Sequence, residues 1–235
     1  MKARPRKNRI GYHAGTQERR PVKGGWLEQR PSFGIELPPV APVLMQSLRA
    51  VGYTTPAAVA DLVDNSIAAA ARQVAIRFTS TPEPLVSVVD NGGGMDERTL
   101  VAAMRFGSRD PRIASTGIDL GRFGLGLKTA SLSQCRRVTV ASRCDGTLAV
   151  AAWDLDECER RGTWWLERPD ASEVPAEILD LLITQDHGTA VVWQKLDRLP
   201  ATGAASVRHA LDINMEDVAD HLAMVFHRFL AGEVA

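Results

Sequence analysis

The chain has 235 residues, of which 45% are hydrophobic and 24% charged, a composition typical of an ordinary folded domain. No apolar run approaches the roughly 20 residues that span a bilayer, and no signal-peptide-like stretch follows the basic N-terminus. These features exclude a membrane partner, and we expect a cytoplasmic location. The three cysteines, Cys135, Cys144 and Cys158, lack C-x-x-C spacing and argue against a disulfide framework or a zinc site.

Charge is unevenly distributed along the chain, although the formal net charge is zero. Residues 1–30 contain nine Lys or Arg against two Glu, a balance of +7, and the remaining 19 basic and 26 acidic residues give −7. We expect residues 1–34 to form a flexible basic arm and residues 35–235 to form one domain. The arm could be a solubilising tail, a strap on a partner subunit, or a contact to nucleic-acid phosphates.

Periodicity and turn signals divide the domain into helices and strands. In chain order, they predict a helix over 39–53, a helix over 55–72 capped by Thr55, a strand pair over 74–80 and 85–90, and a helix over 95–107 started by Asp96. A mobile loop over 108–124 follows, then a helix over 125–134, a hairpin over 137–155 turning at Asp145-Gly146, strands over 163–167 and 189–196 with a helix over 172–183 between them, and a final helix over 205–230. The sum is an α/β (α+β) sandwich, with a mixed, mostly antiparallel sheet and helices on one face.

The polar face of the second predicted helix is the first candidate site. Asp61 and Asn65 are four residues apart in "DLVDNSI", so their side chains lie one turn above each other. A solvated helix face is the alternative interpretation. However, this face carries small alanines and neither Lys nor Glu, a composition that suits a covered surface.

The stretch "VVDNGGGMD" is the second candidate. A strand that ends at Asp90 and continues into Gly92, Gly93 and Gly94 places a carboxylate beside backbone that can approach a flat ligand closely. A tight turn is the alternative, although a turn rarely needs three consecutive glycines.

The stretch "GRFGLGLKTA", residues 121–130, is close to a P-loop, but Leu127 separates Gly126 from Lys128. Its glycines lead directly into a helix, whose first N–H groups and positive dipole end favour a phosphate, and Lys128 would add a charge. A helix start packed tightly on the sheet is the alternative. Further along, Gly188-Thr189 opens a strand with a hydroxyl that could share a water with Asp90.

These four segments, in this order, resemble the GHKL ATPase superfamily (gyrase, the ninety-kilodalton heat-shock chaperones, histidine kinases and MutL), whose Bergerat fold binds ATP. The resemblance spans about Ala57 to Trp193. Within the superfamily, "DLVDNSI", "DNGGGM" and "GRFGLGLKTAS" are most similar to the Microrchidia (MORC) ATPases and their prokaryotic relatives.

The resemblance implies a role for each segment. Asp90 would accept a hydrogen bond from the adenine amino group, with Thr189 helping through water, and Asn65 would bind Mg²⁺. Asp61 would orient or deprotonate the attacking water. Residues 108–122 would form a lid, in which Arg109, Arg112 and Arg122 could touch phosphate. The implied nucleotide-contacting residues are Asn65, Asp90, Gly92, Gly94, Met95, Gly121, Phe123, Gly124, Leu125, Gly126, Lys128 and Thr189.

Three departures from the family pattern affect the expected activity. Asp61 stands where relatives carry Glu, and the missing methylene predicts slow hydrolysis, because a displacement of about 1 Å can cost on the order of 10²-fold in rate. Ala68 stands where relatives commonly carry an acidic residue, so the contacts that hold this helix in place should differ from those of the relatives. Relatives also receive a γ-phosphate lysine from a following domain, so we expect this chain to be part of a longer protein.

The leading functional prediction is Mg²⁺-dependent ATP binding with slow hydrolysis, driving lid closure and homodimerisation, with DNA as a candidate partner. A non-hydrolysing nucleotide-gated clamp or scaffold is one alternative. Phosphotransfer of the histidine-kinase type is another, which the carboxylate at Asp61 and the missing phosphoacceptor-histidine hairpin oppose.

Overall fold

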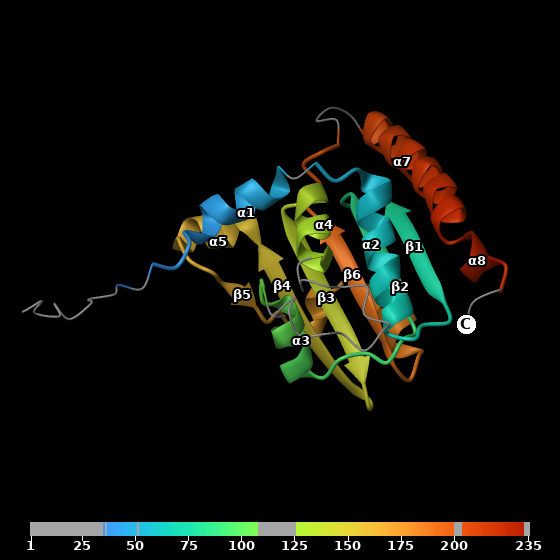
Figure 1. Ribbon diagram of the computed structural model, residues 1–235, viewed down its shortest axis with the longest axis horizontal. Coiled ribbons are helices and arrows are strands. Elements are labelled where there is room, and N and C mark those ends of the chain that lie inside the picture. The colour runs from blue at the N-terminus through green and yellow to red at the C-terminus, as the bar shows by residue number, and fades with distance from the viewer. Residues whose placement is uncertain (1–34, 36, 51, 108–125, 200–203, 233–235) are drawn as a thin grey trace, which may run out of the picture. The chain divides into compact units, whose positions relative to one another are not determined.

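The computed structural model describes residues 35, 37–50, 52–107, 126–199 and 204–232 (Figure 1). The chain divides into two compact units, Met1–Pro38 and Pro39–Ala235, and every described helix and strand lies in the second. The predicted arm and the predicted loop over 108–124 fall outside the described residues. Within the described ranges, no helix combines the length and the apolar character needed to cross a membrane.

The elements follow the predicted order closely. The helices are α1 (Ala41–Arg49), α2 (Thr55–Ala68), α3 (Glu97–Met104), α4 (Gly126–Gln134), α5 (Leu155–Arg161), α6 (Ala176–Ile183), α7 (Ala204–Val225) and α8 (His227–Leu230), with a 3₁₀ turn, η1 (Ala171–Glu173). The strands are β1 (Val74–Thr79), β2 (Leu85–Asp90), β3 (Arg137–Cys144), β4 (Thr147–Asp154), β5 (Leu166–Glu167) and β6 (Gly188–Gln194).

The strands form one six-stranded sheet in the order β1-β2-β6-β3-β4-β5 (Figure 1). All five pairings between these strands are antiparallel, so the α/β sandwich is confirmed but the expected mixed sheet is wrong. The reason is the last strand, β6, which inserts between β2 and β3 and runs antiparallel to both. No local sequence signal reports the direction of such an insertion.

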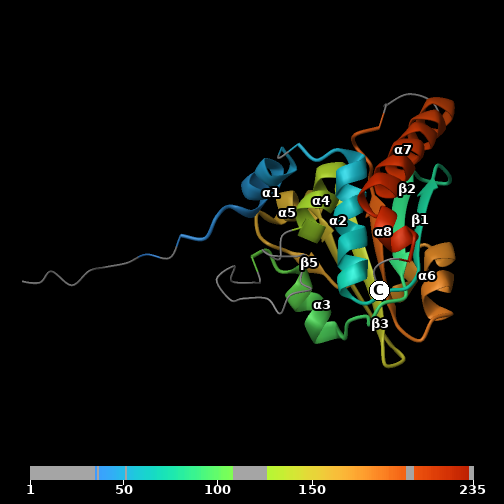
Figure 2. The same cartoon turned by 45° about the vertical axis from the view of Figure 1, so that its right-hand side comes forward.

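Helices cover both faces of the sheet. On one face, α2 and α7 contribute Val59, Leu62 and Leu211 to the larger core. On the other face, Ile178 and Leu182 of α6 pack against the sheet. Figure 2 shows the position of α6 beside the sheet. The prediction of helices on one face is therefore wrong for α6. Successive residues of a strand point to opposite faces, and because all six residues of β2 are buried, the second face also needs a cover.

The helix that carries the first motif begins and ends differently from the prediction. Thr54, not Thr55, is the N-cap of α2, and its hydroxyl accepts a hydrogen bond from the Ala57 amide. The helix ends at Ala68, because Ala70 adopts the left-handed conformation (φ 59°) that usually takes glycine. An alanine in this position gives no stop signal, which explains the predicted extension to residue 72.

The helix α5 is absent from the prediction, although its signals are complete. Asp154 caps its first turn by accepting from the Asp156 amide, and Gly162 ends it in the left-handed conformation. Its acidic first turn and basic last turn also match the helix dipole.

Candidate functional site

A cavity of about 330 Å³ lies on the α2 face of the sheet. It is lined by α2, β2, the segment after β2, α3, the start of α4, and β6. The predicted site residues that line it are Asn65, Asp90, Gly94, Met95, Gly126, Lys128 and Thr189. The structure thus brings together the described parts of all four motif segments. Gly121, Phe123, Gly124 and Leu125 lie outside the described residues.

Asp90 forms one end of the cavity and is almost fully buried. Its Oδ1 accepts from the Gly92 amide at 2.8 Å, and its Oδ2 accepts from the Ser66 hydroxyl at 2.9 Å. Burial raises the pKa of Asp90 above the ordinary 3.8, and these hydrogen bonds partly oppose the rise. The carboxylate is therefore held in one orientation, facing the cavity.

Thr189 lies directly opposite Asp90 in the β2–β6 register. Its hydroxyl is 2.8 Å from the Ser142 hydroxyl, and Ser142 in turn accepts from the Met95 amide at 2.8 Å. Ser142 therefore connects β3, β6 and the segment after β2. Neither Ser66 nor Ser142 could be identified from the sequence, because a lone serine in an apolar segment gives no signal until the register shows what it faces.

The glycines after β2 make room for the protein's own chain. A Cβ on Gly92 would stand 2.8 Å from the Cβ of Ala69, and Gly92 does not line the cavity. Gly94 has a φ of +67°, and a Cβ there would overlap the carbonyl oxygen of Arg143. Close approach of neighbouring protein therefore accounts for both glycines. Gly94 also lines the cavity, so room for a ligand ring at these glycines stays a prediction.

Asp61 lies beyond the other end of the cavity, near the start of α4. A Cβ built on Gly126 would stand 3.8 Å from Asp61 Oδ2, so the carboxylate faces the first residue of α4. The Tyr53 hydroxyl donates to the same oxygen at 2.9 Å. Asn65, one turn along α2, donates its Nδ2 to the Asp61 carbonyl at 2.8 Å. Burial and the charge of Asp61 also raise the pKa of the neighbouring Asp64.

Tyr53 is itself anchored to α4. Its carbonyl accepts from Gln134 Nε2 at 3.1 Å, and its hydroxyl also bonds with the side chain of Thr129. Burial, followed by the bond to Asp61, raises the pKa of Tyr53 above 10.0, so the phenol stays a donor at neutral pH. Tyr53 could not be identified from the sequence, because it precedes α2 and belongs to no motif.

Lys128 is buried at the α3 side of the cavity. Its Nζ donates to the Ala103 carbonyl at 2.6 Å and lies 5.9 Å from the centre of the Phe106 ring. This geometry anchors α4 to α3. A contact from Lys128 to phosphate stays a prediction.

A family model described as "Histidine kinase-, DNA gyrase B-, and HSP90-like ATPase" matches residues 53–189, more than half of the chain. The chain belongs to this family. The match begins at Tyr53 and ends at Thr189, so it covers both ends of the cavity. The GHKL fold inferred from the sequence is confirmed, and the family assignment supports an ATP-binding domain.

The cavity of this GHKL domain therefore has two chemically different ends. At one end, a fixed carboxylate and a hydroxyl face the space from paired strands. At the other, a carboxylate faces the N-terminus of a helix whose first N–H groups favour an anion. These two ends suit a molecule that carries hydrogen-bond donors at one end and negative charge at the other.

Proposed function

We propose that this chain binds ATP with the adenine at Asp90 and the phosphates at the start of α4, and that it hydrolyses the γ-phosphate slowly. The observation that carries the proposal is the position of the two carboxylates. Asp90 lines one end of the cavity, while Asp61 faces Gly126, which lines the other.

Adenine recognition would rest on the orientation of Asp90. Both carboxylate oxygens already accept one hydrogen bond from protein, and each can accept another. The exocyclic amino group of adenine is a donor, and guanine presents a carbonyl acceptor at the same position. A fixed, ionised carboxylate therefore favours adenine over guanine, because an acceptor facing it would be left unpaired.

Asn65 fits the proposed magnesium site. Because its Nδ2 is used by the Asp61 carbonyl, its Oδ1 is the atom left for a hard cation, and Asn65 lines the cavity. Bound Mg²⁺ neutralises negative charge on the phosphate oxygens. The half-buried carboxylates Asp61 and Asp64 on the same helix add negative charge that favours a cation there.

Asp61 would act as the general base of hydrolysis. It would accept a proton from a water molecule while the water oxygen bonds to the γ-phosphorus, and the bond from that phosphorus to the β,γ-bridging oxygen breaks to release ADP. Tyr53 would hold Asp61 Oδ2 and leave Oδ1 for the water. Such positioning would partly compensate for the side chain that is one methylene shorter than glutamate.

We further propose a MORC-like working cycle for the domain. ATP would close residues 108–122 over the phosphates and favour a homodimer, and the basic residues 1–34 would contact the partner subunit or DNA. The motif spelling "DNGGGM" and the +7 balance over residues 1–30 support this part of the proposal.

Incubation of the purified protein with γ-labelled ATP and Mg²⁺ tests the proposed reaction. We expect slow release of labelled phosphate. Label that becomes covalently attached to the protein would indicate a phosphotransferase, and intact ATP that stays bound would indicate a non-hydrolysing clamp. Sedimentation with a non-hydrolysable ATP analogue tests dimerisation, and DNA binding at increasing salt tests the arm, since phosphate contacts weaken steeply as salt rises.

A further inference from the structure

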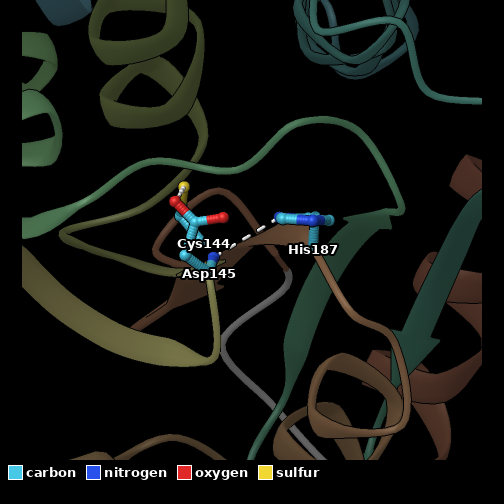
Figure 3. Close-up of side chains that lie close together, drawn as sticks. All are labelled: Cys144, Asp145 and His187. Carbon is cyan, nitrogen blue, oxygen red and sulfur yellow. Dashed lines mark hydrogen bonds between the residues drawn. The ribbon is translucent and has the colours of Figure 1, made fainter.

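Three side chains with metal-ligating atoms gather at the end of the β3–β4 hairpin, as Figure 3 shows: Cys144, Asp145 and His187. One ligand atom from each lies within 4.8 Å of the others. Cys144 Sγ is 3.8 Å from Asp145 Oδ2, and the Asp145 amide points at His187 Nδ1 from 3.5 Å. None of these residues lines the nucleotide cavity.

The sheet register produces this grouping. The β3–β6 pairing ends at Arg143 opposite Gly188, and one further step along both chains puts Cys144 opposite His187. Alternation along the strands gives these two side chains the same face as Ser142 and Thr189. Opposed residues have Cβ atoms about 5 Å apart, so the backbone itself holds the thiol near the imidazole.

The surroundings of the cluster favour a cation. The Asp145 carboxylate lies beside the Cys144 thiol, and Asp96 adds a second negative charge nearby. The positively charged Arg143 is directed away, because its guanidinium donates to the carbonyls of Ile183, at the end of α6, and Gln185.

We propose that Cys144, Asp145 and His187 form a binding site for a zinc-class divalent metal ion. Thiolate, imidazole and carboxylate are the ligands that Zn²⁺ takes in proteins, and water would complete a tetrahedral site. Cysteine spacing argues against a zinc site, but it cannot report this cluster, because His187 reaches Cys144 only through the pairing of β3 with β6. Metal–ligand distances of about 2.0–2.3 Å separate tetrahedral ligand atoms by about 3.3–3.7 Å. The Sγ–Oδ2 distance is close to this range, and a rotation of the exposed Asp145 and half-buried His187 side chains closes the rest.

The site would fasten the hairpin to the start of β6. Arg143, just before Cys144, is the residue against which Gly94 packs, and Gly188-Thr189 directly follows His187. Metal binding would therefore stabilise the two segments that carry Ser142 and Thr189 at the Asp90 end of the cavity. The proposal stands on these contacts alone and does not depend on ATP hydrolysis.

Thiol alkylation tests the site directly, because Cys135 and Cys158 are buried and Cys144 is the accessible thiol of the three. Iodoacetamide labelling, read site by site by mass spectrometry, would be followed with EDTA or with one equivalent of Zn²⁺. We expect Zn²⁺ to slow alkylation of Cys144 in the parent protein. Unchanged labelling would overturn the proposal.

Variants distinguish a site made by all three residues from metal binding by the Cys144 thiol without the other two. His187→Ala should weaken protection about 10-fold or more, since even partners of ligands contribute about 10–100-fold to metal affinity. Asp145→Asn should weaken it too, and Asn tolerates the positive φ of this turn position. His209→Ala, at an exposed position on α7, is the matched control and should retain full protection. Protection in His187→Ala equal to that in the parent would refute the site.

Thermal unfolding gives a second readout. A ligand that binds only the folded state raises the melting temperature, and the rise grows with the logarithm of its concentration over Kd. Zn²⁺ should raise the melting temperature of the parent and of His209→Ala, and not that of Cys144→Ala. An equal rise in Cys144→Ala would contradict the proposal.

Discussion

The two ends of the cavity are built in different ways. At the proposed adenine end, the buried residues Asp90, Ser142 and Thr189 belong to three paired strands, and Ser66 of α2 also donates to Asp90. At the proposed phosphate end, Asp61 is half-buried and accepts from Tyr53, with Gly126 of α4 nearby. Sheet register therefore sets most of the first end, and side chains on helices and their flanking segments set the second.

This difference suggests that one end serves ligand recognition and the other serves hydrolysis. Recognition benefits from side chains that are already ordered, because little conformational entropy is lost when the ligand binds. Hydrolysis benefits from a base that meets its water only after the phosphates are enclosed. Substitutions at the adenine end should therefore change affinity, and substitutions near Asp61 should change turnover.

Asp61→Ala is expected to have the largest effect. Loss of a general base reduces kcat by about 10²–10⁴-fold, while ATP affinity should stay near that of the parent. Steady-state phosphate release together with calorimetric titration of ATP would measure both. Asp180→Ala, at an exposed position of α6 that does not line the cavity, is the control and should leave kcat unchanged. Parent-like hydrolysis by Asp61→Ala would remove Asp61 from the mechanism.

Asp90→Asn is expected to reduce ATP affinity by about 10–100-fold, because a hydrogen bond to a charged group contributes about 1.5–3 kcal/mol. The turnover at saturating ATP should change little. Asp96→Asn provides a comparison, since Asp96 caps α3 and does not line the cavity. If Asp90→Asn bound ATP as tightly as the parent, the adenine end would be misassigned.

Tyr53→Phe removes the donor to Asp61 and the bond with Thr129, and keeps the ring. We expect kcat to fall about tenfold with KM nearly unchanged, because the lost bonds position Asp61 and α4, and neither Asp61 nor Thr129 lines the cavity. Thr55→Val breaks the Thr55–Gln134 bond in the same segment and should leave kcat unchanged. A rise in KM without loss of kcat would mean that Tyr53 acts on binding and not on Asp61.

The pH dependence should be the smallest effect. Because burial raises the pKa of Asp90 above 3.8, falling pH should protonate it and weaken ATP binding at a higher pH than for an ordinary aspartate. The free energy of unfolding should follow the opposite trend with pH. The contribution of Asp90 to it is fully present below pH 3.8 and is lost as pH rises through the raised pKa. Titrations and thermal unfolding across pH, with Asp90→Asn as reference, would check both trends.

Much of the site could be predicted from sequence, because its segments carry local signals. Asp90 ends a strand before glycines, Asp61 and Asn65 lie one turn apart, and Gly126 begins a helix. Roles that depend on packing could not be predicted. Gly94 makes room for a carbonyl of β3, a strand more than forty residues away in sequence.

The sequence by itself determined the order of the elements, the four segments that form the cavity and the family of the protein. Caps, turn residues and motif spacing act within a few residues, so they can be read locally. Only the tertiary structure decided that β6 lies between β2 and β3, that Ser142 faces Thr189, and that Cys144 meets His187. These contacts join segments more than forty residues apart, and their register results from packing both faces of the sheet at once.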